Sequence, residues 1–138
     1  MNQDAENPVP EPVSRVRKAV QNADGIWVFT PEYNAAVPGA LKNLLDWLSR
    51  PLVAGDFSSG TAVMKKKVTI SGAGGKNATR SARHDLKKLL EFMRMEVIFG
   101  EGTGFALDGA AFASDVLSLS EESAAELAKQ VDEFLGAV

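Results

Sequence analysis

The amino-acid sequence predicts an α/β protein with a parallel sheet flanked by helices. Three short runs with strand character, residues 26–29, 68–71 and 96–99, alternate with segments whose apolar residues recur at helical spacing. The connections between these segments are short, which is typical of strands joined by crossover helices. Because right-handed crossovers place the loops that follow such strands at one edge of the sheet, we expect the functional residues there.

Composition limits the classes of function. The 138 residues are 45% hydrophobic, which suffices for one globular domain over residues 1–138. The formal charge of −3, with Lys65-Lys66-Lys67 as the one basic run, argues against nucleic acid as a partner. The lack of cysteine excludes a disulfide framework and thiolate chemistry. Neither a membrane-length apolar segment nor a signal peptide is visible, so we expect a cytoplasmic protein that binds no membrane.

The N-terminal part begins with a polar, proline-rich segment over residues 2–11. A first helix follows, in which Val13, Val16 and Val20 recur at helical spacing. Next comes a strand over residues 24–30, whose continuous apolar run is typical of a parallel strand covered on both faces.

A second helix is predicted from Pro38 to Ser49. Proline is favourable in the first turn, and the Arg50–Pro51 pair ends the helix because the residue before proline avoids the α region. The helix is apolar over most of its circumference, which predicts a subunit interface; the alternative is a helix that lies deep inside the domain. Its apolar residues are Ala40, Leu41, Leu44, Leu45, Trp47 and Leu48.

The middle of the chain is predicted to contain a loop over residues 51–65 and a strand over residues 68–71. Gly72-Ala73-Gly74-Gly75 then turns the chain into a long helix over residues 78–93. The apolar stripe of that helix comprises Ala78, Ala82, Leu86, Leu89, Leu90 and Met93.

The C-terminal part is predicted to contain a third strand over residues 96–99, followed by a glycine-broken loop up to Asp115. Ser118 and Glu121 have the spacing of a capping box at the start of the last helix. The residues that this helix is expected to bury are Leu127, Ala128, Val131, Phe134 and Leu135.

Two segments that follow consecutive strands should form neighbouring walls of one crevice at the carboxyl edge of the sheet. One is Pro31-Glu32-Tyr33-Asn34, and the other is Ser71-Gly72-Ala73-Gly74-Gly75. Glycines allow the backbone to approach a ring closely, and the amide groups of a helix N-terminus can donate to the carbonyl oxygens of a ring. The crevice therefore suits a planar ligand.

The run from Thr30 to Trp47 resembles the flavin-contacting loop of the NADPH-dependent FMN reductase family, and the similarity extends from Asn2 to about Val97. The resemblance implies a flavodoxin-like fold, FMN as the cofactor, and NADPH or NADH as the hydride donor. It also implies residues that border one edge of the flavin ring and residues that close over the other. These cofactor-binding residues are Pro31, Glu32, Tyr33, Asn34, Ser71, Gly72, Gly74 and Gly75.

The same resemblance implies an NAD(P)H oxidoreductase that reduces a small molecule such as a quinone, an azo compound or free flavin. Members of the family form dimers or tetramers, which implies a homodimer or homotetramer through the helix from Pro38 to Ser49. Hydride transfer to flavin is cofactor chemistry, so we expect a positioning role for Glu32, with acid–base chemistry as the alternative, and predict no catalytic side chain. No cluster of metal-binding side chains is evident.

One departure from the family concerns its first strand and serine-rich loop, typically Gly-Ser-x-Arg followed by Ser, which hold the FMN phosphate. This chain has no such stretch, so we expect an N-terminally truncated three-layer sandwich from a fragment, an internal initiation or a mis-assigned start; the alternative is a natural minimal protein. The strand over residues 24–30 would then have a flank that is exposed or paired with another chain. The alternative function is a non-catalytic fragment or self-associating module without flavin, and a third is a nucleotide-binding regulator that uses residues 71–75.

Overall fold

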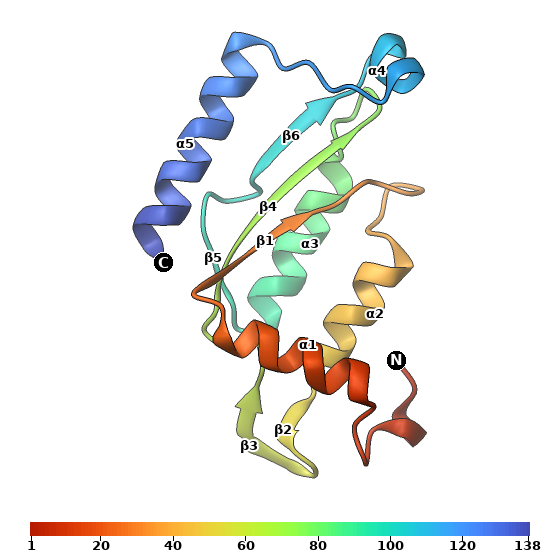
Figure 1. The fold of residues 1–138 in the computed structure, drawn as a ribbon, viewed down its shortest axis with the longest axis vertical. Coiled ribbons are helices and arrows are strands. Elements are labelled where there is room, and N and C mark those ends of the chain that lie inside the picture. Colours follow the sequence, from red (N-terminus) through yellow and green to blue (C-terminus); the bar gives the residue numbers. More distant parts are fainter.

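The computed structural model describes residues 1–138 and contains a four-stranded parallel sheet (Figure 1). Its strands are β1 (Gly25–Phe29), β4 (Lys67–Gly74), β5 (Glu96–Val97) and β6 (Thr103–Ala106). The long strand β4 is central, because it pairs with β1 on one side and with β5 and β6 on the other. The predicted parallel sheet flanked by helices is confirmed.

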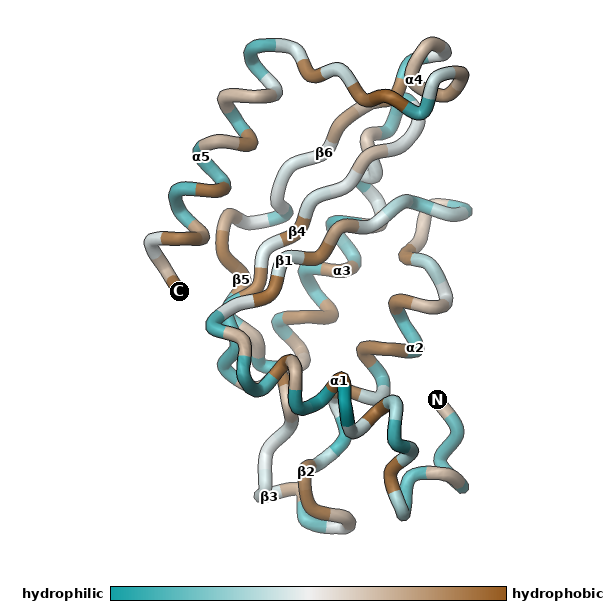
Figure 2. The backbone as a smooth tube through the Cα atoms, in the orientation of Figure 1, coloured by the Kyte–Doolittle hydropathy of each residue, from teal (hydrophilic) through white to brown (hydrophobic).

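Helices cover both faces of this sheet. On one face lie α1 (Glu11–Asn22), α2 (Gly39–Leu48) and α3 (Arg80–Phe92), and on the other lies α5 (Glu121–Ala137). Figure 2 shows hydrophobic stretches along β1 and α2, while the segment that precedes α1 is largely hydrophilic. No helix has the length and apolar content needed to cross a bilayer.

The main hydrophobic core lies between the sheet and α1, α2 and α3. Val68 and Ile70 of β4 and Leu86 and Leu90 of α3 are all 0% exposed within it. Successive side chains of a strand point to opposite faces, so Thr69 and the other odd-numbered residues of β4 face α5 instead. The core therefore uses alternate residues of β4, and the residues between them are available to the opposite face.

The strand β1 is an edge strand, because its only partner in the sheet is β4. Ile26 and Val28 pack against the main core, whereas Phe29 on the other face is 71% exposed. Trp27 stacks on Phe29 with ring centroids 5.5 Å apart and meets the ring of Phe134 from α5 edge-on. The expectation that both faces of this strand are covered is thus wrong, since α5 reaches only part of one face.

The prediction of a loop over residues 51–65 is also wrong. Residues 51–61 form an antiparallel hairpin of β2 (Pro51–Val53) and β3 (Asp56–Thr61). Gly55 in its turn has φ +75°, and the carboxylate of Asp56, the first residue of β3, accepts from the Ser58 amide at 2.9 Å. Most of the hairpin residues are exposed, so no apolar alternation marks these strands in the sequence.

The predicted third strand over residues 96–99 is interrupted. β5 ends at Val97, the chain takes left-handed φ angles at Phe99, Gly100 and Gly102, and β6 resumes the pairing. Because β6 pairs with residues 71–74, β4 continues to Gly74. The predicted turn at residues 72–75 is therefore mostly strand, and the predicted loop up to Asp115 contains β6 and the short helix α4 (Gly109–Ser114).

The last helix begins later than predicted. The hydroxyl of Ser120, and not that of Ser118, caps α5 by accepting from the Ser123 amide at 3.1 Å. The buried face of the helix is also rotated relative to the prediction, because Gln130 is fully buried whereas Leu135 is 62% exposed.

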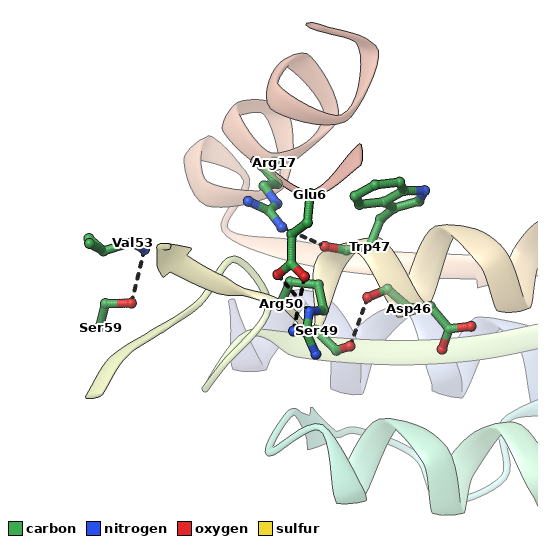
Figure 3. A network of polar contacts seen from close by, with 8 residues as sticks. All are labelled: Glu6, Arg17, Asp46, Trp47, Ser49, Arg50, Val53 and Ser59. Atoms are coloured by element: carbon green, nitrogen blue, oxygen red, sulfur yellow. Dashed lines mark hydrogen bonds and ion pairs between the residues drawn. The ribbon is translucent and has the colours of Figure 1, made fainter. Parts of the chain in front are cut away.

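An ionic network ties the N-terminal segment to the end of α2 (Figure 3). The carboxylate of Glu6 accepts two hydrogen bonds from Arg50, at 2.7 and 3.0 Å, and these bonds hold the pKa of Glu6 below its ordinary value. The guanidinium of the buried Arg17 donates to the carbonyl oxygen of Trp47 at 3.0 Å. A cation at the last carbonyl groups of a helix is favourable, so Arg17 stabilises the C-terminal end of α2.

Leu86→Ala should lower the free energy of unfolding by about 3 kcal/mol, because it opens a cavity in the centre of the core. Phe92→Ala on the same helix is the control, since Phe92 is 86% exposed and its loss should change stability by less than about 0.5 kcal/mol. Urea denaturation followed by circular dichroism measures both. Equal effects for the two variants would contradict the assigned core.

Candidate functional site

A cavity of about 420 Å³ opens at the carboxyl edge of the sheet, between the ends of β1 and β4 and the start of α5. Pro31 lines it from the first predicted segment, and Ser71 and Gly72 line it from the second, so the two segments do meet. The complete lining consists of Phe29, Thr30, Pro31, Ser71, Gly72, Ala73, Phe105, Leu117, Leu119 and Leu127.

The two segments meet because the β1–β4 ladder continues past the end of β1. The amide of Thr30 donates to the carbonyl oxygen of Ser71 at 2.9 Å. A Cβ atom at Gly72 would lie 2.6 Å from the carbonyl oxygen of Thr30 and 2.1 Å from Oγ1 of Thr79. Only glycine fits so close an approach, and Gly72 therefore brings the two backbones together at the cavity wall.

Glu32 connects the first segment to α3. Its carboxylate accepts from the Ala82 amide at 2.9 Å and from Nδ2 of Asn77 at 3.0 Å. The cap residue of α3, Thr79, makes no side-chain capping bond, so Glu32 supplies a cap from a distant loop. The hydrogen bond from the Ala82 amide, followed by that from Asn77, lowers the pKa of Glu32.

Four other predicted cofactor-binding residues do not line the cavity. Tyr33 and Asn34 lie in a tight turn, in which the Tyr33 amide donates to the carbonyl oxygen of Ala36 at 3.0 Å, and the Tyr33 side chain is 63% exposed. Gly74 lies against the methyl group of Thr79, and Gly75 has open space where a side chain would begin. Their contact with a flavin stays a prediction.

The structure adds one residue to the site that the sequence did not suggest. Gln130 of α5 is fully buried, and its Oε1 accepts from the hydroxyls of Ser71 at 3.0 Å and Thr103 at 2.6 Å. Its Nε2 donates to Oγ1 of Thr69 at 2.6 Å and to the carbonyl oxygen of Ile70 at 2.7 Å. All four hydrogen-bonding positions of the amide are used, which anchors β4 directly before the cavity.

A signal for Gln130 is present in the sequence. It lies three residues after Leu127 and four residues before Phe134, and both of these helix positions were predicted to be buried. A glutamine within an apolar helical stripe must find hydrogen-bond partners when buried, so its position alone predicts a polar network.

A side chain of α3 fixes the segment that connects β5 to β6. Nη1 of Arg83 donates to the carbonyl oxygens of Glu101 at 2.9 Å and Gly102 at 2.7 Å. Burial lowers the pKa of Arg83. His84, the only histidine, pairs with the Glu101 carboxylate at 2.6 Å on the exposed face of α3, outside the cavity.

Comparison with known proteins identifies similar sequences and structures. The model of the NADPH-dependent FMN reductase family matches residues 1–108. A quinone reductase of Escherichia coli is 51% identical over 41 residues, which cover 30% of this chain and 22% of that protein. An NAD(P)H-dependent FMN reductase of Pseudomonas aeruginosa is 34% identical over 84 residues, which cover 61% of this chain and 42% of that protein. The chain thus spans less than half the length of either relative.

A solved structure extends the similarity to the fold. FerB, a flavoenzyme NAD(P)H:(acceptor) oxidoreductase from Paracoccus denitrificans, superimposes with a TM-score of 0.80 at 26% identity. The superposition covers 99% of this chain and 72% of the FerB chain. The predicted flavodoxin-like fold is therefore confirmed.

Glu32→Gln tests the cap on α3. Because the pKa of Glu32 is lowered by folding, its contribution to stability is present above the ordinary glutamate pKa of about 4.3 and is lost as the pH falls through the lowered value. The variant should therefore have a lower Tm than wild type at neutral pH and nearly the same Tm in acid. Thermal unfolding at a series of pH values measures the difference, and Glu133→Gln on the exposed face of α5 should leave Tm unchanged throughout. A difference that persisted in acid would contradict the assigned cap.

Gln130→Leu should lower the free energy of unfolding by about 3 kcal/mol, because it leaves buried hydroxyls and a buried carbonyl without their partner. Lys129→Leu, at the exposed neighbouring position, should change it by less than about 0.5 kcal/mol. Urea denaturation distinguishes the two. Wild-type stability in Gln130→Leu would mean that the network contributes little.

Proposed function

Because the chain belongs to the NADPH-dependent FMN reductase family, we propose that it works as an NAD(P)H-dependent flavin oxidoreductase that reduces a small-molecule acceptor. The proposal rests on the apolar cavity where Pro31 meets Ser71 and Gly72. Open α/β sheets bind their ligands outside the carboxyl ends of the strands, which is where this cavity lies. The similarity to the E. coli quinone reductase favours a quinone as the acceptor of this chain. The cofactor would be FMN, and the hydride donor NADPH or NADH.

The cavity fits one part of FMN better than another. Phe29, Leu119 and Leu127 offer apolar surface to a flat ring, and Gly72 lets the backbone come close to it. None of the ten lining residues is lysine or arginine, so the phosphate group finds no cationic side chain there. The residues present therefore suit the isoalloxazine ring but not the phosphate.

The bound flavin would supply the redox chemistry, so the chain needs to bind and orient rather than to transfer protons. The apolar walls would exclude water from the ring. Glu32 would hold its loop, which continues into Tyr33 and Asn34, against α3.

A second candidate function is a self-associating module without flavin. The free edge of β1 and the 71% exposure of Phe29 favour it, because unpaired apolar edge strands readily pair with another chain. Self-association through α2 also stays a prediction. Leu45 and Leu48 are buried in the core of this chain. The apolar residues of α2 that stay at least partly accessible to a partner are Ala40, Leu41, Leu44 and Trp47.

An absorption spectrum of the purified chain after addition of FMN and removal of the excess tests the proposed function. Retained flavin bands, together with NAD(P)H oxidation that depends on a quinone, are expected. A colourless protein without such activity would favour the module.

Gly72→Ala should weaken flavin binding by about tenfold or more, since the added Cβ clashes with the carbonyl oxygen of Thr30 and with Oγ1 of Thr79 and so displaces the cavity wall. Gly136→Ala in α5 is the matched control, because nothing lies within 4 Å of the added atom and the residue lies outside the cavity. Titration of each variant with FMN measures the effect. Equal affinities would exclude the Gly72 wall from the binding site.

A further inference from the structure

The cavity of the proposed function is uncharged. Of its ten lining residues six are hydrophobic, and the polar side chains are those of Thr30 and Ser71. Proteins recognise a phosphate group through cations, free hydroxyl or amide donors, or a helix N-terminus. In this cavity the cations are lacking, and the hydroxyls and neighbouring helix ends are already engaged.

The two hydroxyl groups of the lining are committed elsewhere. Oγ1 of Thr30 donates to the carbonyl oxygen of Pro31 at 2.9 Å, and Thr30 is 3% exposed. Oγ of Ser71 accepts from Nε1 of Trp27 at 3.0 Å, donates to Gln130 at 3.0 Å, and is 2% exposed. Neither hydroxyl can turn toward a ligand without breaking a buried hydrogen bond.

The N-termini of the two helices near the cavity, α5 and α4, are capped by side chains, and α5 also has acidic residues in its first turn. α5 begins directly after Leu119 and Ser120, the Ser120 hydroxyl caps it, and Glu121 and Glu122 occupy its first turn. The carboxylate of Asp108 caps α4 by accepting from the Ala111 amide at 2.7 Å. The Asp108 carboxylate occupies the position at its helix end that a phosphate would take, and the carboxylates of Glu121 and Glu122 would repel a phosphate.

The cations on the α3 side lie outside the cavity, because Lys76 and Arg80 are exposed and do not line it. The guanidinium of Arg83 is used by the carbonyl oxygens of Glu101 and Gly102. The residue after Pro31 is Glu32, whose hydrogen bonds from Ala82 and Asn77 favour the ionised carboxylate. A phosphate near this loop would meet a like charge.

We propose that the cavity recognises a flavin through its ring system alone, so that riboflavin and FMN bind with the same affinity. The inference rests on the proposed function and defines its ligand class as an isoalloxazine with any ribityl tail. The apolar walls take up the ring, while the phosphate of FMN stays in water and contributes no binding energy. Affinity for FMN should therefore be insensitive to salt.

Titrations of the full chain with riboflavin and with FMN, followed by flavin fluorescence at low and high ionic strength, test this. Dissociation constants that agree within about threefold at both salt concentrations support the inference. One charge-assisted hydrogen bond to phosphate is worth roughly tenfold or more, so FMN binding that is tighter by that factor and weakens with salt would overturn it and leave the proposed function standing. Binding of neither flavin would overturn both.

A variant that gains a preference for FMN over riboflavin would show that the isoalloxazine ring binds in this cavity. Leu119→Lys places a cation on the cavity wall and should make FMN bind about tenfold tighter than riboflavin at low salt, with the preference lost at high salt. Val116→Lys, three residues earlier and outside the cavity, should leave the two affinities equal. Circular dichroism checks that both variants fold. An unchanged ratio in folded Leu119→Lys would contradict the assignment of the ring to this cavity.

Discussion

The parallel pairing of β1 with β4 is the constraint on which the rest of the structure depends. Its register runs from Gly25 opposite Lys67 to Phe29 opposite Ser71, and the Thr30 amide extends it by one hydrogen bond. Because β1 ends opposite Ser71 while β4 continues to Gly74, the chain after β1 runs along the end of β4, which puts Pro31 beside Gly72 at the cavity. The same pairing directs alternate residues of both strands into the core beneath α1, α2 and α3.

On its other side β4 pairs with two separate strands, β5 and β6, and α5 supplies a hydrogen bond to β4 where these strands are interrupted. A Cβ at Gly102 would lie 1.7 Å from the carbonyl oxygen of Ile70, so the chain passes β4 too closely there for any side chain. The amide of Gln130 donates to that carbonyl at 2.7 Å and accepts from Ser71. The C-terminal helix thus covers one face of the sheet and also completes the hydrogen bonding of its central strand beside the cavity.

These two features leave the site with few polar side chains that are free to take part in chemistry. The polar side chains around the cavity are engaged with one another, and Glu32 is engaged with the N-terminus of α3. Such a site suits a function in which a cofactor carries the reactive atoms and the protein provides shape. The informative residues of the sequence are accordingly its glycines and prolines.

The sequence by itself determined the parallel sheet, the order of its main helices and the meeting of Pro31 with Ser71 and Gly72, because apolar periodicity and strand order are encoded locally. It did not reveal the exposed hairpin of β2 and β3, which lacks an apolar face, or β6, which is a strand only because the end of β4 is there to pair with it. Tertiary structure alone decided that Glu32 caps α3 and that Gln130 completes β4. Both roles depend on which backbone groups distant segments leave without a partner, so the sequence does not identify the partners of Glu32 or Gln130.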